Sequence, residues 1–141
     1  MSTSLAPAGL GSPGANTLED PVFVVHEGGK LAVEPRYPIT SNEDLSRIYT
    51  PGVARVCMAI ADEPSLTRNL TIKGNTVAVV TDGSAVLGLG NIGPDASLPV
   101  MEGKAVLFKR FAGIDAWPIA LNTQDVDEIV ATVAAIAPVF G

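Results

Sequence analysis

Lys104 is the residue whose position most strongly suggests chemistry. Between Pro99 and Phe111 the apolar residues recur with a period of 3.6, which predicts a helix with one wide apolar face. That face contains Val100, Met101, Ala105, Leu107, Phe108, Phe111 and Ala112, and Lys104 falls near its middle. Burial there would lower the pKa of the amine and prepare it as a general base. The alternative is a lysine whose ammonium group reaches past the apolar surface to water.

Tyr49 is a second candidate because it lies where a helix must be interrupted. A capping-box pattern at Thr40 predicts a helix from about Ser41. Pro51 cannot continue that helix, so a second one is predicted to start near Gly52. A phenol at such a helix end can be presented to a cleft. The alternative is a tyrosine at the edge of the core with its hydroxyl satisfied.

A glycine-rich loop between a predicted strand and a predicted helix is the third candidate. Residues 88–93 read Gly-Leu-Gly-Asn-Ile-Gly and fit the dinucleotide pattern G-x-G-x-x-G, with Asp115 about 20 residues further on. The fingerprint requires a helix that begins at the glycines, whereas the helix here is predicted to start only at Pro99. It also requires an acid at the end of a strand, whereas Asp115 is predicted to begin one. We therefore expect the loop's backbone N–H groups to line a pocket for a small anion.

The elements that position these residues indicate an α/β domain. Val77–Val80 predicts a strand buried on both faces, and residues 115–121 predict another, where Pro118 indicates a sheet edge or strand start. A final helix is expected after a cap at Asn122 or Thr123. Near the start, residues 21–25 predict a short strand, and residues 27–33 a turn into a hairpin or extended arm. We expect a central, mostly parallel sheet with flanking helices.

Composition narrows the class of protein. The chain has 141 residues, a formal net charge of −6 and one cysteine, Cys57. These values argue against a nucleic-acid surface and an internal disulfide framework, and favour a reducing compartment. No stretch predicts a membrane span or a secretory signal, so a cytoplasmic location is expected. His26 has no companion ligands and is interpreted as structural. Residues 1–18 predict a disordered or loosely attached arm, and residues 19–141 one domain.

Three motifs together resemble the N-terminal domain of malic enzymes of the short bacterial type. They are Ile48-Tyr49-Thr50-Pro51-Gly52-Val53-Ala54, then residues 81–94 from Thr81-Asp82-Gly83-Ser84 to Gly93-Pro94, and Met101-Glu102-Gly103-Lys104-Ala105 with Phe108-Lys109. The resemblance covers roughly residues 20–141. It implies oxidative decarboxylation of L-malate to pyruvate and CO2, with Mg2+ or Mn2+ and reduction of NAD or NADP.

The resemblance also assigns roles. Lys104 would be the general base that takes the hydroxyl proton during oxidation, and Tyr49 the general acid that protonates C3. The two side chains should then share one cleft. An arginine that many larger members carry two residues after Asp-Gly is replaced by Ala85, so Ser84, Gly90 and Asn91 are the candidates for holding the substrate carboxylate.

No metal or nucleotide ligand is expected within this chain. Asp82 and Asp95 are interpreted as turn formers. The resemblance places the metal ligands and a Rossmann-type nucleotide domain beyond Gly141, so we expect the 141-residue fragment alone to be inactive. It also implies a homodimer, in which residues 1–35 are a candidate to cross to the partner. The alternative is a non-catalytic module that binds a small dicarboxylate.

Overall fold

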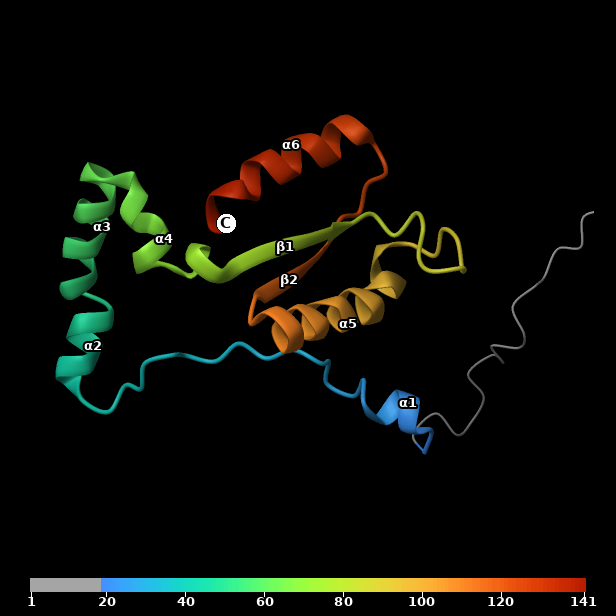
Figure 1. Ribbon diagram of the computed structural model, residues 1–141, viewed down its shortest axis with the longest axis horizontal. Coiled ribbons are helices and arrows are strands. Elements are labelled where there is room, and N and C mark those ends of the chain that lie inside the picture. The colour runs from blue at the N-terminus through green and yellow to red at the C-terminus, as the bar shows by residue number, and fades with distance from the viewer. Residues whose placement is uncertain (1–18) are drawn as a thin grey trace, which may run out of the picture.

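The domain is built on one parallel βαβ unit (Figure 1). The computed structural model describes residues 19–141; the predicted arm at 1–18 lies outside the described residues. Strands β1 (Thr76–Thr81) and β2 (Asp115–Ala120) pair in parallel, with Thr76 opposite Asp115 and Thr81 opposite Ala120. Helix α5 (Pro94–Ala112) connects them. The predicted α/β class and the strands predicted at residues 77–80 and 115–121 are confirmed.

The remaining helices flank this unit or precede it. They are α1 (Pro21–Val24), α2 (Asn42–Ile48), α3 (Gly52–Asp62), α4 (Thr67–Leu70) and α6 (Val126–Ile136), with 3-10 turns η1 (Pro64–Leu66), η2 (Ile72–Asn75) and η3 (Ala137–Val139). The predicted break between α2 and α3 is confirmed. The Ser41 hydroxyl caps α2 by accepting a 3.1 Å hydrogen bond from the backbone N–H of Asp44. None of the helices among the described residues has the length and apolar character needed to cross a bilayer.

Two local predictions, the strand at residues 21–25 and the cap of the last helix, are wrong. In both places a side-chain cap decides where a helix begins. Residues 21–24 form a helix, since the Asp20 carboxylate accepts from the N–H of Val22 at 2.8 Å. Of the two forms predicted for the next segment, a hairpin or an extended arm, the extended one is present. Residues 30–36 run as an extended segment, here called the strap, beside α5 and β2. Helix α6 is capped by Asp125, not by Asn122 or Thr123.

Helix α5 begins five residues earlier than predicted and keeps Pro99 in its interior. Its buried stripe is narrow: Ser97, Met101 and Ala105 recur every four residues and face the sheet. Leu107, Phe108 and Phe111, which were assigned to the same apolar face, are exposed, and Phe111 is 79% exposed. A two-stranded sheet is too narrow to cover the whole apolar arc of this helix.

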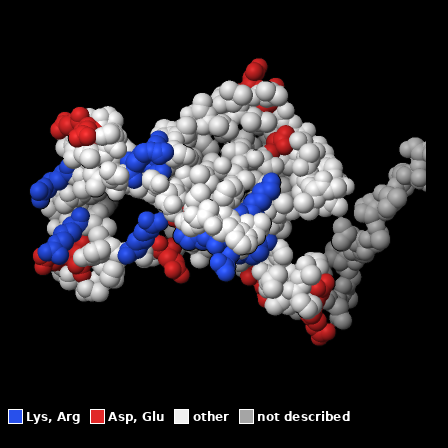
Figure 2. Space-filling view, viewed as in Figure 1, with Lys and Arg blue, Asp and Glu red and all other residues white. Residues whose placement is uncertain are grey.

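The helices before β1 have little core of their own. Every buried residue of the described chain lies between Thr76 and Ala105. Helices α2 and α3 pack on each other and stand away from β1, β2 and α5 (Figure 1). In the space-filling view an opening separates this helical pair from the body of the domain (Figure 2).

The last residue returns to the free edge of β1. The N–H of Gly141 donates a 2.9 Å hydrogen bond to the carbonyl of Thr76, the first residue of β1. The Lys73 ammonium holds the preceding turn by donating to the carbonyl of Pro138 at 3.0 Å. Pro118 lies in β2, which pairs with β1 alone among the described strands, so the predicted edge position is confirmed.

Candidate active site

Lys104 lies on the exposed side of α5, one residue before buried Ala105. Its amine hydrogen-bonds to no described residue. The prediction that Lys104 is buried is therefore wrong for this chain by itself. Val100, Leu107 and Phe108 lie three or four residues away and flank it on the helix surface. A second surface laid on this face would remove water from the amine.

Tyr49 ends α2 and is 67% exposed. Its hydroxyl likewise has no hydrogen-bond partner among the described residues. The neighbouring Gly52 lets the two helices meet closely, because a Cβ at this position would lie 2.5 Å from the carbonyl oxygen of Ser46 on α2. The local sequence thus fixes a tight α2–α3 corner with the tyrosine at its edge.

The structure does not bring Tyr49 and Lys104 together within one chain. Tyr49 belongs to the α2–α3 pair, whereas Lys104 belongs to α5, which packs on the two strands (Figure 1). Lys and Arg side chains lie around the opening between these two parts (Figure 2). The shared cleft therefore stays a prediction that a single chain does not fulfil.

The glycine loop is closed at its base by Gly83. The carbonyl of Gly83 accepts from the N–H groups of Ile92 and Gly93, both at 3.2 Å. A Cβ on Gly83 would lie 2.1 Å from the carbonyl carbon of Gly93, and its φ is +72°, so only glycine fits this close approach.

Of the predicted carboxylate-binding residues, Gly90 and Asn91 lie in this loop and Ser84 lies four residues before it; all three are exposed. The Ser84 hydroxyl donates to Asp82 at 2.7 Å, and the Asn91 amide donates to Gln124 at 3.2 Å. The hydrogen bonds to Ser84 lower the pKa of Asp82. The backbone N–H groups of Gly88, Gly90 and Asn91 donate to no described acceptor. Within residues 88–93 these three amides are available as donors, and the amides of Ala85 and Leu87 just before them are also unpaired among the described residues.

One argument against a dinucleotide site needs correction. Helix α5 starts at Pro94 directly after Gly93, so no separate segment divides the glycines from the helix. Two other features still differ from the fingerprint. The first glycine of the pattern, Gly88, comes seven residues after β1 ends at Thr81, and Asp115 is the first residue of β2, bound by cations.

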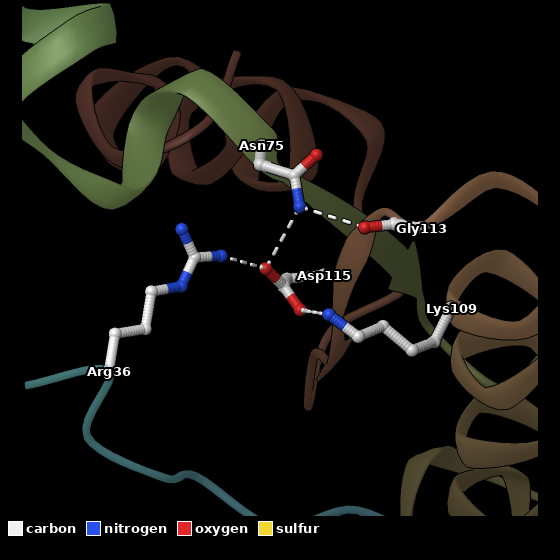
Figure 3. A network of polar contacts seen from close by, with 5 residues as sticks. All are labelled: Arg36, Asn75, Lys109, Gly113 and Asp115. Atoms are coloured by element: carbon white, nitrogen blue, oxygen red, sulfur yellow. Dashed lines mark hydrogen bonds and ion pairs between the residues drawn. The ribbon is translucent and has the colours of Figure 1, made fainter.

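Asp115 binds three side chains from three other segments (Figure 3). Its Oδ2 atom accepts from Arg36 at 2.8 Å and from Asn75 at 3.0 Å, and its Oδ1 atom accepts from Lys109 at 2.6 Å. These contacts, led by the hydrogen bond from Lys109, hold the pKa of Asp115 below its usual value. The sequence suggested Asp115 only as a ribose ligand and did not identify its three partners. Positions 36, 75 and 109 follow no common spacing, so no sequence pattern connects them with Asp115.

A cavity of about 610 Å³ lies between the strap and the body. Its walls include Leu31, Arg36, Ala105, Lys109 and Trp117. None of the predicted site residues lines it, so the cavity does not mark the predicted chemistry. Three or more His, Cys, Asp or Glu side chains do not gather anywhere in residues 19–141 in a way that could hold a metal ion. The described residues therefore do not fit a metal site.

These features define an α/β domain that leaves wide apolar surfaces uncovered. Comparison with known proteins gives the family. The family model described as "Malic enzyme, N-terminal domain" matches residues 28–140, and the chain belongs to the malic enzyme family as this N-terminal domain.

Three similar proteins illustrate the relationship. The NAD-dependent malic enzyme of Geobacillus stearothermophilus is 60% identical over 124 residues, covering 88% of this chain and 26% of the relative. The bifunctional malic/malolactic enzyme of Bacillus subtilis (strain 168) is 60% identical over 113 residues, covering 80% and 28%. The crystal structure of malic enzyme from Pyrococcus horikoshii Ot3 superposes with a TM-score of 0.79 at 56% identity, covering 80% and 26%. The chain thus spans about a quarter of the length of these relatives.

Proposed function

We propose that this chain is the substrate-side domain of a longer malic enzyme that converts L-malate to pyruvate and CO2 while reducing NAD or NADP. The observation that carries the proposal is the family match over residues 28–140, which contain Tyr49, the glycine loop and Lys104. Residues 19–141 would form the domain, and its metal and nucleotide sites would lie in another part of the protein. The chain without them would be inactive, and the enzyme would act in the cytoplasm.

The proposed chemistry divides between the two side chains. The neutral amine of Lys104 would take the proton of the C2 hydroxyl as C2 is oxidised. The nucleotide, when bound by another part of the protein, would supply the hydride acceptor. Loss of CO2 then leaves the electron pair of the broken carbon–carbon bond on the pyruvate enolate. The phenol of Tyr49 donates its proton to C3 and completes pyruvate. Lys104 must lose water for the first step, because desolvation favours the uncharged amine.

We further propose that the missing cover comes from a second copy of the chain. The chain exposes 10748 Å². Residues 1–18 contribute at most about 2,400 Å² to this area, and a compact chain of the remaining mass would expose about 6,300 Å². The excess of about 2,100 Å² is area that a second copy and the rest of the longer protein would cover between them. One partner of a permanent dimer interface buries about 1,000–2,500 Å².

In this homodimer Tyr49 of one copy would face Lys104 of the other. The exposed apolar side chains around Lys104 would exclude water from the interface. The α2–α3 pair stands away from the strands and α5 of its own chain, so it would be able to contact the second copy. The same arrangement would shield the amine from water and bring the protonated lysine close to the phenol that must donate its proton.

The substrate carboxylate would bind at the glycine loop. The free N–H groups of Gly88, Gly90 and Asn91 support this assignment, because backbone N–H groups in such loops form concave anion sites. Ser84 would contribute by turning its hydroxyl from Asp82 to the substrate, and Asn91 by its own side chain.

The test is made in the full-length protein. Lys104→Ala should abolish malate oxidation, and Tyr49→Phe should slow proton delivery to C3 with malate binding nearly unchanged. Co-expression of the two inactive variants should then restore activity. Half of the dimers formed at random are mixed, and each mixed dimer has one site with both side chains intact, so about a quarter of the original turnover should return.

Each result has a distinct meaning. No recovery in mixed dimers would place both side chains in one chain and contradict the shared site, while leaving their roles standing. Near-normal turnover of Lys104→Ala on its own would contradict the base assignment. A monomer in sedimentation equilibrium would contradict the dimer.

A further inference from the structure

Asp115 lies where one long segment, residues 37–74, leaves the body of the domain and returns to it. This segment is called the excursion below. Arg36 is the last residue of the strap, and Asn75 is the last residue of η2. Between them run residues 37–74, which include α2, Tyr49 and α3. Arg36 and Asn75 both donate to the same oxygen of Asp115, at 2.8 and 3.0 Å, as Figure 3 shows.

The other oxygen of Asp115 binds the helix that carries Lys104. Lys109 donates to it at 2.6 Å and lies five residues after Lys104 on α5, about 7.5 Å along the helix axis. One carboxylate therefore connects both ends of the tyrosine-bearing excursion to the lysine-bearing helix. Asn75 adds a second tie by donating to the carbonyl of Gly113 at 2.9 Å, directly after α5 ends.

The strap transmits this anchoring to α2. Tyr37, next to Arg36, donates to Asp44 at 3.4 Å, and Thr40 donates to the same carboxylate through its hydroxyl at 2.8 Å and its N–H at 3.1 Å. Asp44 lies in the first turn of α2. Two sets of polar contacts, joined by the peptide bond between Arg36 and Tyr37, thus connect Asp115 to the helix that ends at Tyr49.

We propose that Asp115, through Arg36, is a positioning residue that sets where Tyr49 is presented for proton transfer. This inference rests on the proposed role of Tyr49. The ion pair is partly exposed, with Arg36 75% and Asp115 25% exposed, so its contribution to folding is small. Placement is more sensitive than folding, since a shift of about 1 Å in a reacting group can cost about 100-fold in rate.

The test compares Arg36→Gln with Lys109→Gln in the full-length protein. Each variant removes one cation from Asp115, but only Arg36→Gln removes the tie between Asp115 and the end of the strap. The readout is the exchange of the C3 protons of pyruvate for deuterium in D2O, followed by NMR. In this reaction the Tyr49 phenolate takes a proton from C3, which is the proposed protonation in reverse. The phenol then exchanges its proton with D2O and returns a deuteron to C3, which is the proposed protonation in the forward direction. Reduction of oxaloacetate by NADH or NADPH, whichever the enzyme accepts, serves as the second readout, because it needs Lys104 and not Tyr49.

We expect Arg36→Gln to slow pyruvate exchange about 10- to 100-fold and to leave oxaloacetate reduction close to its original rate. Lys109→Gln should leave pyruvate exchange close to its original rate. Arg36→Lys should recover part of the exchange, because one ammonium can still reach Asp115. Circular dichroism and the thermal midpoint confirm that each variant is folded.

Tyr49→Phe separates the two hypotheses. If it retains exchange, the role proposed for Tyr49 is wrong. If it loses exchange while Arg36→Gln keeps it, the positioning inference is wrong and the role of Tyr49 stands. Equal losses of exchange in Arg36→Gln and Lys109→Gln, or a parallel loss of oxaloacetate reduction in Arg36→Gln, would show a general structural effect and also overturn the inference.

Discussion

The carboxylate of Glu102, on α5, accepts a 2.9 Å hydrogen bond from the backbone N–H of Lys30, 72 residues earlier in the chain. The ammonium of Lys30 donates in turn to the carbonyl of Pro99 at 2.7 Å. Glu102 therefore fixes the first residue of the strap, as Asp115 fixes the last. The strap is held at both ends by carboxylates and crosses the cavity between them.

Removing the first anchor should expose the strap to trypsin. In Glu102→Ala we expect cleavage after Lys30 to accelerate about ten-fold, since a hydrogen bond to a charged group contributes about 1.5–3 kcal/mol and part of this is recovered by water. Limited proteolysis with mass spectrometry measures the rate. Glu34→Ala removes an exposed carboxylate from the strap itself and should leave cleavage unchanged. Equal rates in both variants would show that Glu102 does not anchor the strap.

The glycine loop provides a matched pair of substitutions. Gly83→Ala should destabilise the protein by several kcal/mol, or prevent folding, because its methyl group would overlap the backbone of Gly93 and its φ is positive. Gly88→Ala has open space around its Cβ and should be tolerated. Thermal unfolding and soluble yield compare them. A stable Gly83→Ala variant would mean that the loop closes differently.

Gly103 offers a gain in stability with a loss of activity. It lies inside α5 with open space around its Cβ, so Gly103→Ala should raise the free energy of unfolding by about 0.5–1 kcal/mol through helix propensity. Turnover should fall, because the methyl group enters the face that we propose is covered near Lys104. Gly113→Ala, at the left-handed C-cap with φ +68°, should destabilise instead. Unchanged turnover of Gly103→Ala in the full-length enzyme would argue against a tight cover there.

Acid should weaken the contacts of Asp115. Its folded pKa lies below the unfolded value of about 3.9, so the stabilisation is complete above that value and is lost as pH falls through the folded pKa. Asp115→Asn should therefore be less stable at neutral pH by under about 1 kcal/mol, with the difference shrinking in acid. Urea midpoints measured over a pH series provide the check. Asp62→Asn, which removes an exposed carboxylate without a cation partner in the described chain, should show no such trend.

Local signals predicted the elements that depend on neighbouring residues. Pro51 separated α2 from α3, and the β-branched run at Val77–Val80 identified β1. The sequence predicts the start of α5 at Pro99, because proline is favoured in the first turn of a helix. The helix begins at Pro94, and proline is favoured at that first position for the same reason. A single-residue rule cannot choose between two prolines that both suit a helix start.

The candidate site was less accessible to sequence reasoning. Periodicity placed Lys104 within an apolar arc, but burial depends on how much surface faces that arc, and two strands cover only the stripe of Ser97, Met101 and Ala105. The Asp115 contacts join residues 36, 75 and 109, and no local pattern relates these positions. Such junctions are set by the crossing of distant segments.

Every buried residue among residues 19–141 lies between Thr76 and Ala105, and this has a consequence for synthesis of the protein. The ribosome releases α1 to α4, with their exposed valines and leucines, before the core of this domain has been synthesised. At about 5–20 residues per second, the stretch from β1 through β2 takes a few seconds to follow. During that interval the exposed valines and leucines of α1 to α4 are open to any chaperone that binds short apolar segments.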